Sequence, residues 1–134
     1  MKRIVLLLFA LFFVVFGLIG CSKYSSHYNA VGHVYSSDSD SARTSFMEFE
    51  GTEVFKLKCK SKNIAGITYS GKLEMGSATV YCDCGGTKTE LFSIHSGEEV
   101  DSCYDYLPED TVYIIIETSE KCQNGDFTFE IFYG

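Results

Sequence analysis

The sequence lacks the patterns by which many enzyme classes are recognised. It has no Gly-x-Ser-x-Gly turn for a serine nucleophile and no glycine-rich loop that would hold a phosphate group. After residue 21, no stretch has the spacing of an amphipathic helix. Its carboxylates cluster beside turn residues, where they are expected to be solvated: Glu98-Glu99-Asp101, Asp105 and Glu109-Asp110. The sequence therefore predicts no catalytic residues and a protein that is not an enzyme.

Positive charge is scarce. The chain has 11 Lys and Arg against 18 Asp and Glu, and its formal charge is −7. Two of the basic residues, Lys2 and Arg3, precede residue 21, while all the acidic residues follow it. The part after residue 21 is thus still more acidic than the whole. Such a chain is a poor partner for nucleic acid, and a cationic protein is a better electrostatic match.

The first 21 residues carry the most specific signal. Lys2 and Arg3 precede an uncharged run from Ile4 to Ile19, which is typical of an export signal. Leu18-Ile19-Gly20-Cys21, at the end of this run, resembles the lipobox of bacterial lipoproteins. The resemblance implies that residues 1–20 are a removed signal peptide and that Cys21 carries acyl chains. There are two alternatives. The apolar run could be a transmembrane helix, or it could be an ordinary signal peptide followed by a Cys21 that forms a disulfide.

This resemblance also implies a location. Acyl chains on Cys21 would anchor the protein to the cell membrane or cell envelope, facing outside the cytoplasm. From residue 22 to about residue 43 the chain is rich in Ser, Asp, Tyr and His, which is typical of a flexible polar segment. We therefore expect residues 21–43 to be a tether, with Tyr24, Tyr28 and Tyr35 able to dock part of it as an edge strand.

Six cysteines in an exported chain indicate an oxidising compartment and disulfide bonds. If Cys21 carries lipid, five candidates remain: Cys59, Cys82, Cys84, Cys103 and Cys122. Five thiols allow at most two disulfides within the chain, and their connectivity stays open. Cys82-Asp83-Cys84 with His95 or Cys59 is an alternative soft-metal site. Its spacing of one residue is too short for known structural zinc sites, so no metal and no cofactor are predicted.

Residues 44–134 show the alternation of β-strands. Phe55, Leu57 and Cys59 alternate with lysines, and Gly85-Gly86 predicts a hairpin turn. Thr111 to Glu117 is β-branched and aromatic, and Asn124-Gly125 predicts a turn into a last strand. These features predict an all-β fold: a single antiparallel β-sandwich, jelly-roll-like or barrel-like, with about seven to eight strands in residues 44–134.

Two segments are similar to small exported bacterial β-sandwiches, such as the domains appended to secreted peptidases. These are Gly71-Lys72-Leu73-Glu74-Met75 and Gly125-Asp126-Phe127-Thr128-Phe129-Glu130-Ile131. The similarity is one of architecture. Tyr104-Asp105-Tyr106 beside Pro108 is the best candidate for an exposed recognition loop, and a rim of the sandwich is the alternative interpretation.

The sequence thus favours a membrane-anchored bacterial lipoprotein whose β-sandwich is a non-catalytic binding or structural module at the cell envelope. Its expected partners are the membrane, through lipid on Cys21, and an unknown protein or glycan. Two other hypotheses remain open. One is a metal-binding lipoprotein that uses thiols and His, and the other is an acidic inhibitor of a basic envelope enzyme such as a lysozyme.

Overall fold

The structure, a computed structural model, describes residues 23–60 and 64–134. Within those residues it contains nine β-strands: β1 (His27–Val31), β2 (Val34–Ser37), β3 (Ser41–Lys58), β4 (Ile64–Met75), β5 (Ser77–Asp83), β6 (Lys88–His95), β7 (Glu98–Tyr104), β8 (Thr111–Thr118) and β9 (Cys122–Tyr133). No helix in the described part of the chain is long and apolar enough to cross a membrane. The predicted signal peptide and Cys21 lie outside the described residues.

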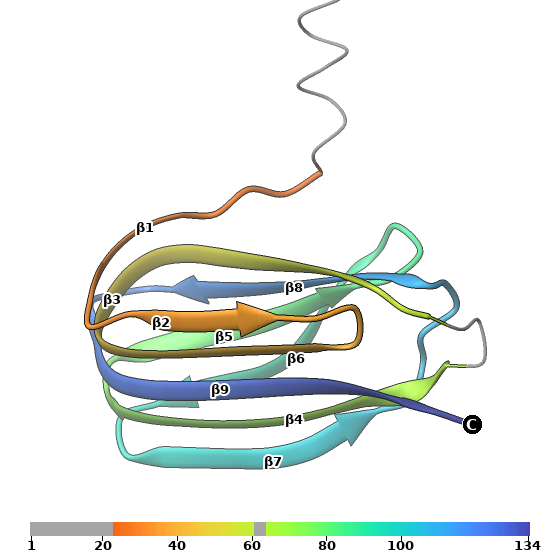
Figure 1. Cartoon of the computed structure of the whole chain (residues 1–134). Helices are drawn as coiled ribbons and strands as arrows, with labels where there is room; N and C mark the ends of the chain where they lie inside the picture. The colour runs from red at the N-terminus through yellow and green to blue at the C-terminus, as the bar shows by residue number, and fades with distance from the viewer. Residues whose placement is uncertain (1–22, 61–63) are drawn as a thin grey trace, which may run out of the picture.

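All paired strands are antiparallel, in the order β6-β5-β8-β3-β9-β4-β7, with β1 and β2 added to β3. The long strand β3 belongs to both layers, because its first half pairs with β9 and its second half with β8. In Figure 1, β9, β4 and β7 lie below β8 and β5. The predicted all-β antiparallel sandwich is confirmed, with nine strands in the described residues where seven to eight were expected.

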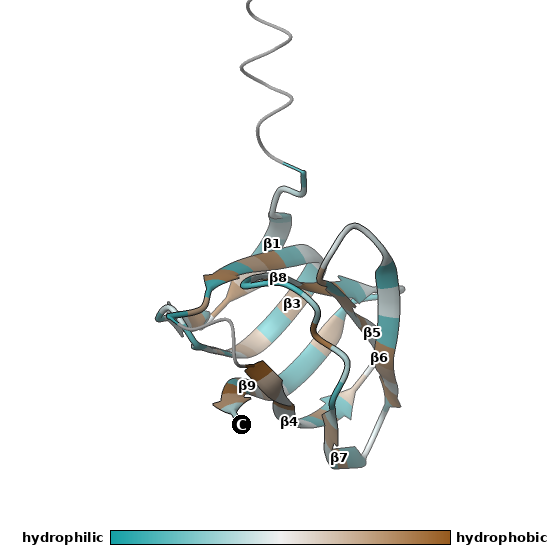
Figure 2. Ribbon diagram, turned by 90° about the vertical axis from the view of Figure 1, so that its right-hand side faces the viewer, coloured by the Kyte–Doolittle hydropathy of each residue, from teal (hydrophilic) through white to brown (hydrophobic). Residues whose placement is uncertain are grey.

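The core fills the space between the layers. Hydrophilic and hydrophobic residues alternate along the strands, as the teal and brown bands in Figure 2 show. The largest fully buried side chains include Phe49, Phe127, Phe129, Leu57 and Ile114, all at most 1% exposed. Burying an aromatic or aliphatic side chain of this size contributes about 1.5–3 kcal/mol. The alternation read from the sequence therefore identified the inward face of the strands.

The predicted turn at Asn124-Gly125 is wrong, because both residues lie inside β9. The chain turns earlier, between Thr118 and Cys122. Gly125 pairs with Phe46, and a Cβ on Gly125 would lie 2.3 Å from Cζ of that ring. The glycine is therefore required by close packing against an aromatic ring, while Asn124 has a positive φ of 51° at a local irregularity of the strand.

The segment predicted as a tether also differs, because residues 27–43 belong to the sheet. Strand β1 pairs with β3 from His27↔Thr52 to Val31↔Glu48, and β2 pairs with β3 from Val34↔Ser45 to Ser37↔Ala42. The polar Ser-Asp run forms the turn between β2 and β3. The expectation that part of this segment could dock as an edge strand is met by β1 and β2, because backbone pairing to β3 does not require apolar side chains.

Candidate functional site

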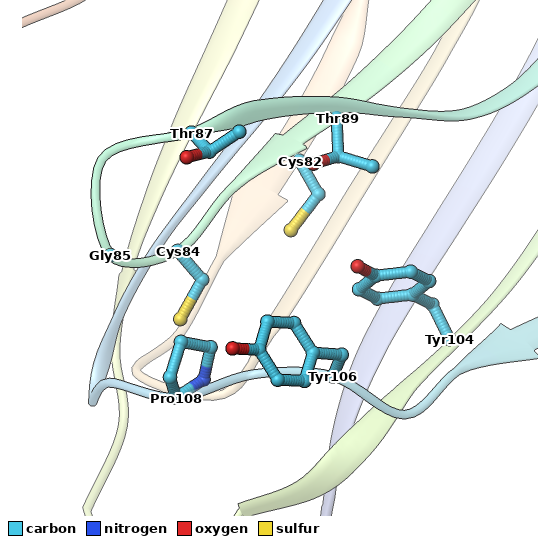
Figure 3. A pocket seen from close by; sticks show the side chains of 8 residues that line it. All are labelled: Cys82, Cys84, Gly85, Thr87, Thr89, Tyr104, Tyr106 and Pro108. Carbon is cyan, nitrogen blue, oxygen red and sulfur yellow. The ribbon is translucent and has the colours of Figure 1, made fainter.

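A pocket of about 220 Å³ opens at one end of the sandwich. One wall is the end of β5, the β5–β6 turn and the start of β6, and the other is the end of β7 with the chain that follows it. The lining residues are Cys82, Cys84, Gly85, Thr87, Thr89, Tyr104, Tyr106 and Pro108. Figure 3 shows the two tyrosine rings on one side and the two threonines on the other.

Local backbone geometry shapes the first wall. Gly85 and Gly86 have φ of 89° and 102°, which the predicted hairpin turn at these glycines requires. Asp83 Oδ1 accepts a hydrogen bond of 2.9 Å from the Gly86 amide. This turn holds Thr87 and Thr89 at the pocket, so the wall depends on one carboxylate and two glycines.

The second wall carries the predicted recognition loop. Tyr104 is the last residue of β7 and is half-buried, while Tyr106 is 70% exposed. Buried Leu107 fixes the chain between Tyr106 and Pro108 to the core. Both predicted tyrosines therefore line the pocket, whereas Asp105 is exposed and is not a lining residue. Their role in binding remains a prediction.

The two thiols in the pocket are held in their neutral form. Burial, followed by the neighbouring charges of Cys84 and Asp83, raises the pKa of Cys82 to about 12. Burial also raises the pKa of Cys84, whose Sγ donates to the Glu109 carbonyl at 3.2 Å and accepts from the Glu109 amide at 3.3 Å. A thiolate is the form that attacks electrophiles or binds metal, so this environment disfavours both reactions.

The predicted disulfides are not formed in the structure, where all five described cysteines are free thiols: Cys59, Cys82, Cys84, Cys103 and Cys122. Cys122 is not a lining residue of the pocket, and its Sγ donates a hydrogen bond to the Ser77 carbonyl at 3.4 Å. In the described residues, no three or more His, Cys, Asp or Glu side chains are grouped to hold a metal. His95 contacts Ser77 Oγ at 2.9 Å instead of Cys82 or Cys84.

Asp83 is a functional group that the sequence reasoning missed. It is 2% exposed, and its Oδ2 accepts a 2.5 Å hydrogen bond from the Tyr24 hydroxyl and lies 2.9 Å from Lys23 Nζ. Burial alone would raise the pKa of this carboxyl, but the donors Tyr24, Lys23 and the Gly86 amide hold it below its usual range. The position of Asp83 three residues before Gly86 was the available signal, since Asp often binds the backbone of a following turn.

Glu53 is the second buried carboxylate, at 3% exposure. Its Oε2 lies 2.9 Å from His33 Nε2, which also contacts Thr44 Oγ1 at 3.0 Å. The His33 side chain is only 9% exposed. No pocket lies over this pair among those described, so we assign it a structural role between the β1–β2 turn and β3.

A second, broader hollow lies over β4, β7 and β9. Its lining is polar or charged except for two residues: Ser70, Gly71, Lys72, Glu99, Val100, Asp101, Asp126 and Thr128. It contains no aromatic ring. Ligand pockets usually combine aromatic or apolar surface with a few placed polar groups, and only the Tyr104–Tyr106 pocket has that combination of the two.

No protein family and no curated protein matches this chain in sequence. Among solved structures it is similar to a family 61 carbohydrate-binding module, TmCBM61, in complex with β-1,4-galactotriose: 13% identity, 82% of this chain and 86% of that chain, TM-score 0.48. A family 29 module complexed with mannohexaose has 14% identity over 81% and 93% of the chains, with a TM-score of 0.41. A further family 29 module has 15% identity, over 81% of this chain and 77% of that chain, with a TM-score of 0.42. These values give no basis for transferring a ligand to this chain.

Proposed function

We propose that this protein is a lipid-anchored, non-catalytic binding module of the bacterial cell envelope, and that its Tyr104–Tyr106 pocket binds a saccharide. The observation that supports the proposal is the pairing of two tyrosine rings with two threonine hydroxyls across one small pocket. A sugar ring has an apolar face of C–H groups and an equatorial rim of hydroxyls. A tyrosine ring suits the face, and threonine hydroxyls and the tyrosine O–H groups suit the rim.

The pocket also lacks the groups of a hydrolase. Glycosidases place two carboxyls across the scissile bond, and no Asp or Glu lines this pocket. Its two thiols are neutral and hydrogen-bonded or buried, so they contribute surface and not a nucleophile. Binding without turnover is the activity that this set of side chains supports.

The experiment that tests this function is a calorimetric titration of the detergent-solubilised full chain with soluble oligosaccharides. The first probes are β-1,4-galactotriose and mannohexaose, the ligands of the structural neighbours, followed by envelope-type glycans. We expect the Tyr104→Ala, Tyr106→Ala double variant to bind about 5- to 150-fold more weakly, because stacking on each ring contributes about 0.5–1.5 kcal/mol.

The matched control is Tyr35→Ala, because Tyr35 is 60% exposed but lies on β2, where it lines a separate hollow with Ser36 and Arg43. This control should bind as the parent does. Unchanged affinity in the double variant, or no binding of any saccharide by the parent, would contradict the proposal. The anchor is tested separately, since Cys21→Ser should release the protein from the membrane fraction.

A further inference from the structure

The first described residues of the chain are fastened to the pocket end of the sandwich. Tyr24 and Lys23 contact Asp83 at 2.5 Å and 2.9 Å, and the Tyr24 ring lies edge-on to Tyr113 with centroids 5.2 Å apart. Ser26 Oγ accepts a 2.8 Å hydrogen bond from the Val54 amide. Residues 23–26 therefore run along the sheet, and we name the contact of Lys23 and Tyr24 with Asp83 the clamp.

The clamp adjoins the pocket through a single carboxylate. Asp83 Oδ2 accepts a hydrogen bond from the Tyr24 hydroxyl and forms an ion pair with Lys23. Asp83 Oδ1 accepts a hydrogen bond from the Gly86 amide of the β5–β6 turn. That turn supplies Gly85 and Thr87 to the pocket lining. The Lys23 side chain is 45% exposed, so solvent screens its ion pair, and the Tyr24 hydrogen bond to the buried carboxylate is the stronger contact.

Covalent geometry then limits where the anchor lies. Cys21 is two residues before Lys23, and two residues span at most about 7 Å even when fully extended. A free tether over residues 21–43 would instead reach about 75 Å. In Figure 1 the chain meets the fold above the sheet that carries β8 and β5, on the side toward the β5–β6 turn. A lipid on Cys21 would thus be attached close to the pocket.

From this placement we infer that the clamp holds the pocket end of the domain at the membrane, so that the pocket serves saccharides displayed at the bilayer surface, as the head groups of membrane lipids. This inference rests on the proposed function and the proposed anchor. With only Ser22 between Cys21 and the clamp, the pocket cannot extend far from the head-group layer. A glycolipid in the same leaflet is therefore the ligand within reach.

The geometry is tested on the lipidated full chain in phosphatidylcholine vesicles that contain nitroxide-labelled lipid. A fluorescent amino acid replaces either Glu109, exposed beside the pocket, or Glu120, exposed in the β8–β9 turn at the other end of β8. The two positions lie at opposite ends of β8, roughly 23 Å apart, so quenching at Glu109 should exceed that at Glu120. Equal quenching at the two positions would overturn the inference.

Two variants separate the clamp from folding. A Gly-Ser linker of about 12 residues inserted between Ser22 and Lys23 leaves every described contact intact but adds a mean reach of about 19 Å, so the quenching ratio should fall toward one. The Lys23→Ala, Tyr24→Phe double variant should lower it in the same direction. Lys121→Ala, which removes only a 3.5 Å surface pair with Glu48, should leave the ratio unchanged.

A binding measurement distinguishes failure of this inference from failure of the proposed function. Soluble saccharide should bind the linker variant as tightly as the parent, because the pocket is unchanged. A glycolipid with the same saccharide, in the same vesicle, should bind the linker variant several-fold more weakly. Equal glycolipid binding by both proteins would overturn the membrane-surface inference alone, whereas loss of soluble-saccharide binding to Tyr104→Ala, Tyr106→Ala supports the proposed function whatever the quenching shows.

Discussion

The two buried carboxylates hold the same N-terminal segment to the sandwich in physically different ways. The two carboxylate oxygens of Asp83 are contacted by three donors: the Tyr24 hydroxyl, the Lys23 ammonium and the Gly86 amide. Glu53 binds His33 through Oε2, and its Oε1 has no hydrogen-bond partner among the described residues. The pKa of Asp83 is lowered, while burial raises the pKa of Glu53 in spite of its contacts with Thr44 and His33.

Two differences act together, because Glu53 lies deeper among packed atoms than Asp83 and also has fewer donors. Both residues are at most 3% exposed. A carboxylate with several donors recovers the solvation it loses, whereas one with an unpartnered oxygen does not. Asp83 is therefore suited to be the charged acceptor of the clamp, and Glu53 stabilises the fold least when it is ionised.

The largest effect is expected from Asp83→Ala. The change leaves the Tyr24 hydroxyl and the Gly86 amide without their acceptor, and removing one partner of a buried charged group costs about 3 kcal/mol. Urea denaturation followed by circular dichroism measures the loss. Asp101→Ala on β7, where Asp101 is exposed, should stay within about 0.5 kcal/mol of the parent. A loss no larger than that of the control would show that the clamp contributes nothing.

Tyr24→Phe should have an intermediate effect. It removes the 2.5 Å hydrogen bond but keeps the ring that packs on Tyr113. A hydrogen bond to a charged group contributes about 1.5–3 kcal/mol, and partial exposure of Tyr24 reduces this to about 1–2 kcal/mol. The same urea experiment measures it, with Tyr35→Phe as the control. A more stable Tyr24→Phe variant would contradict the assignment of Asp83 as a charged acceptor.

Glu53→Gln should change stability least. The amide is nearly the same size and carries no charge to desolvate, so at neutral pH the variant should lie within about 1 kcal/mol of the parent or be slightly more stable. Asp83→Asn is the matched comparison, and we expect it to lose about 2 kcal/mol because a charged acceptor of several donors is removed. Equal losses in Glu53→Gln and Asp83→Asn would remove the distinction between the two sites.

The fold class could be predicted from the sequence because it depends on alternation, a local property. Phe55 and Leu57 point inward and Lys56 outward, as the period-two pattern requires. The Gly85-Gly86 turn was predicted for the same reason. Asn124-Gly125 was not, because the requirement for glycine there comes from Phe46, which lies 79 positions earlier in the chain. Local reasoning cannot distinguish a turn glycine from one that makes room for a distant ring.

The candidate site was predicted in part for a similar reason. Tyr104 and Tyr106 were found because aromatic residues beside a proline mark a loop. The two tyrosines lie opposite Thr87 and Thr89 because the sheet curls until its two end strands, β6 and β7, face each other, which no local pattern reports. Asp83 was missed because its partners, Lys23 and Tyr24, are about 60 residues away in a segment whose polar composition is typical of a tether.

The pH dependence of stability gives the smallest effect and the sharpest form of the contrast. The folded pKa of Asp83 lies below its unfolded value of about 3.9, so the unfolded chain binds more protons there. Its contribution is therefore present above about pH 4 and is lost as pH falls through the folded pKa.

Glu53 has the opposite sign. Because its folded pKa is raised, the folded chain binds more protons, and its contribution to stability is fullest below the unfolded pKa of about 4.3 and is lost as pH rises through the folded value. Unfolding free energies of the parent, Asp83→Asn and Glu53→Gln between about pH 3 and 8 measure both. The parent-minus-Asp83→Asn difference should rise with pH and the parent-minus-Glu53→Gln difference should fall. If the two differences changed with pH in the same direction, the donors around Asp83 would not outweigh its burial. The clamp would then be a neutral contact that acidification does not open.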